Sequence, residues 1–354
     1  MHSQALASLH QHLLTELAGK LGHARRLFHG RGLRWPGLEE ITVDWLQGVV
    51  LVCLFRQPLE AELHALKTLL VTLAQTPEWQ RAQAHSLLLQ HRYREGDATT
   101  PGLNPAQPAN TGAANPSPVN PGPANQSSRA EWIVGQAHSE WFISEDGLRF
   151  QLDLGQKQNT GLFLDMRYGR RWVREQAEGK RVLNLFAYTC GFSVAAIAGG
   201  ATQVVNLDMA KGALNRGRDN HRLNQQDLSR VSFLGHELFK SWSAVKRYAP
   251  YDLIIIDPPT FQKGSFVLTQ DYAKILRRLP DLLNPDGQVL ACVNDPHIGP
   301  DFLLAGMAEN APVLRFEQRL ANPPEFADVH EHGGLKALVF RLVGAPQNAE
   351  ANNV

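Results

Sequence analysis

The chain has 354 residues, of which 43% are hydrophobic and 19% charged, so it can build one large or two ordinary folded domains. Its formal net charge of +1 gives no overall attraction to nucleic acid, and any RNA contact must come from a local basic patch. The cysteines Cys53, Cys190 and Cys292 stand far apart, which argues against a disulfide framework and fits a reducing cytoplasm. We expect no signal peptide, and no run approaches the ~20 apolar residues that span a bilayer.

The first part of the chain predicts a small α+β domain made of residues 1–95 and 130–155. Leucines at helical spacing predict helices over 4–27 and 58–74, and apolar alternation predicts strands within 41–55, 87–91, 131–134 and 141–154. Residues 96–129 are rich in Pro, Asn, Ala and Gly and hold almost no large apolar side chain. They predict a disordered insertion, because such a segment buries too little surface to offset its ordering entropy.

From about residue 160 the pattern changes to buried strands separated by helices, which is typical of an α/β fold with a doubly wound, mostly parallel sheet. The predicted strands are 182–186, 204–208, 231–234, 252–257 and 288–293, and the predicted helices are 192–198, 211–223 and 271–283. A final antiparallel pair is expected over 313–320 and 336–342. These elements define a second domain, 156–345, followed by a flexible tail, 346–354.

Two consecutive strand ends predict a cofactor site. The run 183–192 is an apolar strand that passes through a turn of small residues into a helix, and Gly191 would let the backbone approach a ligand closely. Asp208 ends the next strand, where a carboxylate can accept hydrogen bonds from ribose hydroxyls; the alternative is a cap for the helix near Lys211. A diphosphate-cradling GxGxxG turn is absent, so the pattern favours a cofactor without phosphate over NAD.

A third strand end carries Asp257, Pro258, Pro259, Thr260 and Phe261. The two prolines end the strand and fix a rigid turn, so a carboxylate, backbone carbonyls and an aromatic ring would face the crevice. These groups suit a planar base, which stacks on the ring while polar groups read its edge. An ordinary Asp-Pro turn is the alternative interpretation.

Four motifs together resemble the family of bacterial 23S rRNA methyltransferases: QNTGLFLDMR (158–167), LNLFAYTCGF (183–192), VVNLDMA (204–210) and DPPTF (257–261). The resemblance covers residues 130–342 well and 20–95 in part. It implies a Rossmann-like class I methyltransferase domain that uses S-adenosyl-L-methionine, preceded by a small α+β domain that helps to hold RNA. The family includes C5-cytosine enzymes, often called RlmI, and guanine-N7 enzymes, called RlmK.

The resemblance also implies which residues bind the cofactor, position by position. They are Thr160, Phe163, Asp165, Phe186, Ala187, Gly191, Asp208, Glu237 and Asp257. Within this set, Asp208 would hold the ribose. Glu237 stands where the family usually has Asp against the adenine amino group.

The residue after the fifth strand bears on which base is methylated. The C5-cytosine members carry a cysteine there, because C5 becomes reactive only after a thiolate adds to C6; this chain has Asn294. Cys292 lies two residues earlier, within the strand, and we expect it to be a small core residue. The guanine-N7 members carry Asn at this place, and N7 has a free lone pair that needs no base. The resemblance therefore places the chain nearest the guanine-N7, RlmK-like branch.

We accordingly expect direct methyl transfer to guanine N7 of 23S rRNA, free or in an assembling large subunit, in the cytoplasm and without metal or membrane. The expected catalytic residues are Asp257, Pro258, Pro259, Phe261 and Asn294. The alternatives are methylation of cytosine C5, of an exocyclic amine or of a small molecule, and a cofactor-binding, RNA-associated protein that has lost catalysis. Exocyclic-amine enzymes usually place an aromatic residue directly after the second proline, where this chain has Thr260.

Two arginine clusters are candidates for phosphate contacts with RNA. The first follows the first predicted helix, where a solvated helix end is the alternative: Arg25, Arg26, Arg31 and Arg34. The second lies beside the cofactor loop: Arg167, Arg170, Arg171 and Arg174.

Overall fold

The computed structural model describes residues 1–93 and 129–343, which form two compact units. Unit 1 comprises Met1–Trp141 and Asp153–Thr160, and unit 2 comprises Phe142–Leu152 and Gly161–Val354. The predicted disordered insertion, 96–129, and the predicted tail, 346–354, lie outside the described residues, except that Arg129 begins a strand. No helix among the described residues is long and apolar enough to cross a bilayer.

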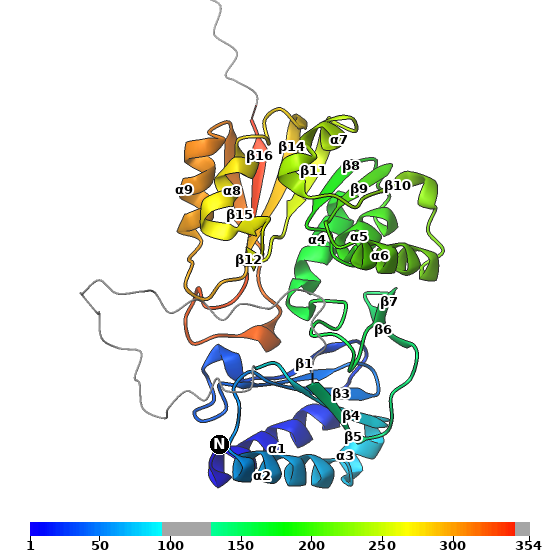
Figure 1. Ribbon diagram of the computed structural model, residues 1–354, viewed down its shortest axis with the longest axis vertical. Helices are drawn as coiled ribbons and strands as arrows, with labels where there is room; N and C mark the ends of the chain where they lie inside the picture. The colour runs from blue at the N-terminus through cyan, green and yellow to red at the C-terminus, as the bar shows by residue number, and fades with distance from the viewer. Residues whose placement is uncertain (94–128, 344–354) are drawn as a thin grey trace, which may run out of the picture. The chain divides into compact units, whose positions relative to one another are not determined.

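Unit 1 is a five-stranded sheet in the order β1-β2-β3-β4-β5, with helices on one face (Figure 1). Its strands are β1 (Arg25–His29), β2 (Ile41–Trp45), β3 (Val49–Leu54), β4 (Ser86–His91) and β5 (Arg129–Val134), and its helices are α1 (Ser3–Ala18), α2 (Glu60–Leu73) and α3 (Pro77–Arg81). The helix predicted over 4–27 is wrong beyond Ala18. It ends at Gly19, and Leu27 belongs to a strand whose side chains share the core with the helix.

Unit 2 contains a seven-stranded sheet in the order β10-β9-β8-β11-β14-β16-β15. The first five of these strands are parallel, and β16 runs antiparallel to both of its neighbours. The bounds are β8 (Arg181–Leu185), β9 (Gln203–Leu207), β10 (Val231–Leu234), β11 (Tyr251–Ile256), β14 (Leu283–Val293), β15 (Leu314–Arg319) and β16 (Lys336–Leu342). This topology confirms the predicted doubly wound, Rossmann-like sheet and its final antiparallel pair.

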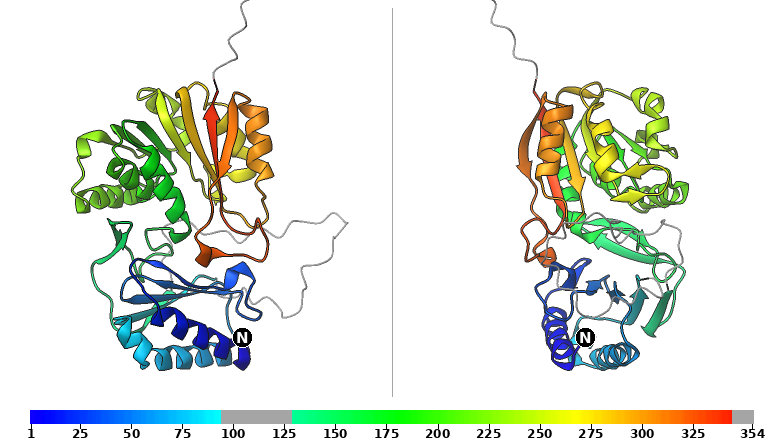
Figure 2. Two further views of the ribbon diagram at one scale, coloured as in Figure 1. Left: turned by 180° about the vertical axis from the view of Figure 1, so that it is seen from behind. Right: turned by 60° about the vertical axis from the view of Figure 1, so that its left-hand side comes forward.

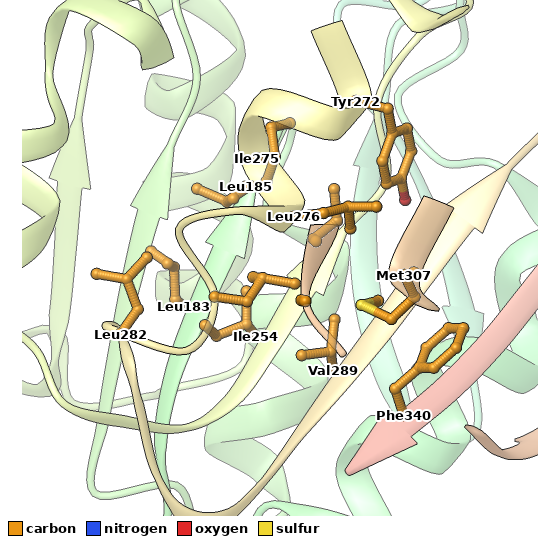
Figure 3. Packing of buried hydrophobic residues seen from close by; sticks show 14 of the residues in the cluster. Leu183, Leu185, Ile254, Tyr272, Ile275, Leu276, Leu282, Val289, Met307 and Phe340 are labelled. Atoms are coloured by element: carbon orange, nitrogen blue, oxygen red, sulfur yellow. The ribbon is translucent and has the colours of Figure 1, made fainter. Parts of the chain in front are cut away.

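Helices cover both faces of this sheet, as two further views show (Figure 2). They are α4 (Arg167–Gln176), α5 (Gly191–Ala198), α6 (Lys211–Leu223), α7 (Trp242–Lys246), α8 (Leu268–Leu276) and α9 (Asp301–Asn310). Successive side chains of β11 point to opposite faces of the sheet. Ile254 packs with α8 and α9 in one core cluster, and Ile255 packs with α4 and α5 in another. Figure 3 shows the first cluster, where Ile254 and Val289 lie below Ile275.

The hairpin of β6 (Trp141–Glu145) and β7 (Leu148–Leu152) belongs mostly to unit 2, which differs from the predicted domain 130–155. Two backbone amides of β7 donate to asparagine side chains: Arg149 N to Oδ1 of Asn224, just after α6, at 2.8 Å, and Gln151 N to Oδ1 of Asn220, in α6, at 2.9 Å. These contacts join residues about 70 positions apart in the chain, so local patterns could not reveal them.

Candidate active site

The turn after β8 has an unusual backbone. Phe186, Tyr188 and Cys190 have φ angles of 57°, 47° and 62°, in the left-handed region that favours glycine, although none of them is glycine. Helix α5 begins directly afterwards at Gly191, at the carboxyl edge of the parallel strands. Strained backbone of this kind concentrates at functional sites, and this edge is where doubly wound sheets bind ligands.

Asp208 links this turn to the loop after β9. Its carboxylate accepts hydrogen bonds from Tyr188 N at 2.8 Å and Ala210 N at 2.7 Å. Burial raises the pKa of Asp208, and the two backbone donors oppose this shift. Each carboxylate oxygen retains a further lone pair, so the group can support the turn and still accept a ribose hydroxyl.

A pocket opens beside Asp208. Its lining is apolar and aromatic with two acids: Phe186, Leu207, Asp208, Met209, His236, Glu237, Leu238, Phe239, Gln262, Ser265 and Phe266. The ring of Phe266 lies 5.0 Å from that of Phe186 and 6.4 Å from that of Phe239, between centroids. Aromatic walls with a few polar groups suit an adenosine, so the residues present fit the predicted cofactor.

Three predicted cofactor residues line this pocket: Phe186, Asp208 and Glu237. Glu237 Oε1 also accepts a hydrogen bond from Phe239 N at 2.7 Å. The sequence prediction missed Met209 and Phe266. Met209 directly follows the strand-ending acid and could have been found, whereas Phe266 reaches the pocket only through the fold.

A second group of polar residues surrounds the end of β11. Asn294, exposed just after β14, donates from Nδ2 to Asp165 Oδ2 at 3.0 Å. The pKa of Asp257 is raised to about 7, mainly by burial and also by nearby Asp165, while Arg170 acts in the opposite direction. Because a carboxylate can only accept, Asn294 turns its amide nitrogen to Asp165 and its carbonyl oxygen away. The structure thus brings together three predicted residues as a cluster of hydrogen-bond acceptors.

The rest of the DPPTF motif continues into a short antiparallel β-hairpin. Pro258 is buried, and Phe261 begins β12 (Phe261–Gln262), which pairs with β13 (Phe266–Val267). The amide of Leu268 donates to the Thr260 carbonyl at 3.0 Å. This short hairpin, absent from the sequence prediction, holds Phe261 half-buried after the proline turn.

The remaining predicted cofactor residues lie outside the pocket. Phe163 is 44% exposed, with its ring 5.4 Å from that of Tyr188. Ala187 is buried beneath the turn, and a Cβ on Gly191 would come within 3.1 Å of the Leu162 side chain. Gly191 thus makes room for Leu162, where we expected a ligand. Thr160 belongs to unit 1, and its carbonyl accepts from Asp153 N.

Three of the four arginines of α4 are paired with carboxylates, and the fourth, Arg174, donates to a backbone carbonyl. Arg170 forms a two-bond ion pair with Glu145 at 2.6 and 2.7 Å, with both side chains about 5% exposed or less. The other pairs are Arg167 with Glu325, Arg171 with Asp146, and Arg174 with the Asp146 carbonyl. These contacts argue against phosphate binding by this cluster most strongly at the buried Arg167 and Arg170, and the phosphate-binding role stays a prediction.

All three cysteines are buried. Cys292 lies within β14 in the core shared with α4 and α5, as predicted, and burial raises its pKa well above the usual value. Burial raises the pKa of Cys190 likewise, and that of Cys53, in unit 1, to about 11. None of them presents a thiolate to a substrate.

Comparisons with known proteins agree with this geometry. Residues 25–111 and 122–341 match the model of the S-adenosylmethionine-dependent methyltransferase family. A putative methyltransferase from Streptococcus mutans has the same fold, with 22% identity, a TM-score of 0.75, and coverage of 96% of this chain and 82% of that one. A further putative methyltransferase structure, complexed with SAH, gives 22% identity, a TM-score of 0.74, and coverage of 95% and 80%.

Curated relatives match over a shorter range. Ribosomal RNA large subunit methyltransferase I of Serratia proteamaculans is 38% identical over 153 residues, which are 42% of this chain and 39% of that protein. The protein of that name from Salmonella paratyphi B is 39% identical over 152 residues, 42% and 38% of the two chains. The chain thus matches about two fifths of their length.

These names bear on the branch to which the chain was assigned. They correspond to the C5-cytosine, RlmI branch of the resemblance, so the placement nearest the guanine-N7 branch is not supported by these relatives. The coarser prediction is confirmed by the family match, which spans most of the chain, and by the sheet topology. The chain belongs to the family of S-adenosylmethionine-dependent methyltransferases and uses that cofactor.

Proposed function

We propose that this enzyme methylates a base of large-subunit ribosomal RNA by direct transfer, without a covalent cysteine intermediate, and that guanine N7 is the acceptor. The RNA substrate is suggested by the names of the curated relatives, and a role on ribosomal RNA would place the protein in the cytoplasm. The observation that carries the mechanism is the acceptor cluster of Asp257, Asp165 and Asn294, in a chain whose thiols are all buried.

The acceptor cluster would orient the base. Bound S-adenosylmethionine supplies a methyl group on a sulfonium. The outward carbonyl of Asn294 and the carboxylate of Asp257 can accept hydrogen bonds from N1–H and N2–H of guanine, which leaves the N7 edge free. The N7 lone pair forms the new bond to carbon while the carbon–sulfur electron pair stays on sulfur, and no proton leaves N7. Positioning of this kind can supply about 7–11 kcal/mol of the barrier.

Methylation of cytosine C5 is the second candidate, because the relatives carry the name that the family resemblance associates with this reaction. It requires a thiolate that adds to C6 of the base. Cys292 is fully buried in β14, and burial holds its thiol protonated. For this route Cys292 would have to leave the core, which makes it the residue that separates the two candidates.

The test is mass spectrometry of nucleosides from the large-subunit rRNA of a strain without the gene, complemented by variants. We expect one 7-methylguanosine to be lost in the deletion, restored by C292A and not by N294A. N294A should reduce methyl transfer about 10–100-fold at unchanged cofactor affinity, since it removes a hydrogen bond to the base. Asn310→Ala, at the half-buried last residue of α9, is the control.

Other outcomes of this experiment discriminate sharply. Loss of a 5-methylcytidine, with C292A inactive, would favour the C5 reaction and overturn direct transfer. An rRNA nucleoside profile that does not change in the deletion strain would overturn the RNA substrate altogether.

A further inference from the structure

One edge of the unit 1 sheet gathers residues from distant parts of the chain. Strands β1, β3 and β4 end there, and β2 and β5 begin there, as the pairs Thr42–His29, Ile41–Leu54 and His91–Arg129 show. Arg31 follows β1, Phe55 follows β3, and Arg92 follows β4. Because β3 and β4 are parallel neighbours, Phe55 and Arg92 leave the sheet side by side.

The two arginines pack against the same aromatic ring. The Cζ atom of Arg31 lies 4.4 Å from the centroid of Phe55, and that of Arg92 lies 5.2 Å from it. Arg92 Nη2 donates to a neutral partner, Asn159 Oδ1, at 2.8 Å. Arg31 makes no hydrogen bond or ion pair of 4 Å or less with any residue in the described ranges. A ring that orients guanidinium planes leaves their N–H edges available.

Carboxylates neutralise only part of this charge. Arg26 is ion-paired with Asp44 at 2.5 Å. The negative charge of Glu40 interacts with Arg31 and favours its charged form. The pKa of His29 is lowered to about 3, mainly by burial and in part by the charges of Arg26 and Arg31. His29 is therefore neutral at physiological pH and adds no charge to this edge.

The backbone that carries Arg31 is tightly held. The 3₁₀ turn Gly30–Gly32 is buried at both glycines, and a Cβ on Gly30 would lie 1.9 Å from the Leu38 carbonyl oxygen. A guanidinium on such a turn is positioned before a ligand arrives, which lowers the entropy cost of binding.

We propose that Arg31 and Arg92, oriented by Phe55, form an oxyanion site that binds a phosphate group of the RNA backbone. This site is separate from the acceptor cluster of unit 2, and its RNA ligand rests on the proposed function. A phosphate oxygen pair matches the planar N–H edge of a guanidinium, and the two side chains together supply several donors. Within the predicted first cluster, Arg25 and Arg26 contribute less, because they face Glu16 and Asp44.

The test measures binding of the full chain to an unmodified large-subunit rRNA transcript over a range of salt concentrations. The double variant R31Q/R92Q should bind about tenfold or more weakly, with a salt slope shallower by about one. R81Q is the matched control, because Arg81 is an exposed arginine of unit 1 paired within its own helix. S-adenosylhomocysteine binding, which reports unit 2, should not change. If the double variant fails to fold, R31Q alone keeps the test, since that side chain is exposed and makes no hydrogen bond with the described residues.

A second arm, with inorganic phosphate as the ligand, separates the two proposals. If R31Q/R92Q and R81Q bind the transcript as the unsubstituted chain does, the phosphate site is overturned and the RNA function stands. If the unsubstituted chain binds no RNA, yet phosphate raises its melting temperature and not that of R31Q/R92Q, the site binds a free anion and the RNA function fails. If neither ligand binds, both proposals fail.

Discussion

At the scale of single residues, the chemistry of the acceptor cluster depends on which donor and acceptor atoms of its side chains are not already hydrogen-bonded within the protein. Asn294 gives its amide nitrogen to Asp165, so the atom it offers outward is an acceptor. We had expected from the sequence that Asn294 itself would contact a guanine edge, and the contact with Asp165 specifies which of its atoms can do so. The resemblance implies that Asp165 is a cofactor residue; it contacts Asn294 and acts on Asp257, and we propose that it belongs to the substrate side.

Asp257 predicts a pH dependence of both activity and stability. If its carboxylate accepts from the base, methyl transfer should rise as pH increases through about 7, and D257N should lack this rise. The folded pKa lies above the unfolded value, so protonation stabilises the fold: this contribution is present below pH ~4 and is lost as pH rises through about 7. Over that window the unsubstituted chain should lose up to about 4 kcal/mol relative to D257N.

Methyl-transfer rates from pH 5.5 to 8.5 and urea unfolding at about pH 5 and 8 measure these two effects. The same inflection in D257N, or none near 7 in the unsubstituted chain, would show that another group is responsible.

At the scale of elements, the β6–β7 hairpin and α4 are held together by charge. Glu145 and Arg170 are both buried, and removing one partner of such a pair leaves an uncompensated charge that costs about 3–5 kcal/mol. Glu145→Gln should therefore lower the free energy of unfolding by about 3 kcal/mol, since the amide still accepts one hydrogen bond.

Asp146→Asn provides a matched control for that change, because its partner Arg171 is 44% exposed and such pairs contribute at most about 1 kcal/mol. Urea unfolding of the two variants would check this prediction. An equal loss of stability in both would mean that burial of the pair is not what holds the hairpin.

At the scale of the whole molecule, the two units have separate cores, and the proposed cofactor pocket lies in unit 2. Adding S-adenosylhomocysteine should slow amide hydrogen exchange over 186–191, 206–210 and 236–239, because local opening there would require the ligand to leave. Exchange in β1–β5 should stay unchanged. Hydrogen-exchange mass spectrometry makes the measurement, and equal protection of unit 1 would contradict the assignment of the pocket.

The sequence by itself determined the fold of unit 2 and part of the lining of its proposed cofactor pocket. Apolar runs such as 252–257 predict buried strands from the local sequence alone. In a parallel sheet, the residues that follow such strands lie at the same edge. This is why Asp208 could be predicted to lie beside the turn after the first strand, whereas Phe186 and Glu237 are predicted through the family resemblance. Cys292 could be assigned to the core for the same local reason, since its strand is apolar on both sides.

Only the tertiary structure decided which arginine side chains remain able to bind a phosphate. The arginines of α4 seemed suited to phosphate until the hairpin and Glu325, which are distant in sequence, supplied their carboxylates. Arg31 and Arg92 are 61 positions apart and meet only at the ring of Phe55, because β1, β3 and β4 end at the same edge of the unit 1 sheet. Which residues are buried, and how strands and helices alternate, can be predicted from local sequence patterns. Which charged side chains pair depends on which strands and helices become neighbours when the chain folds.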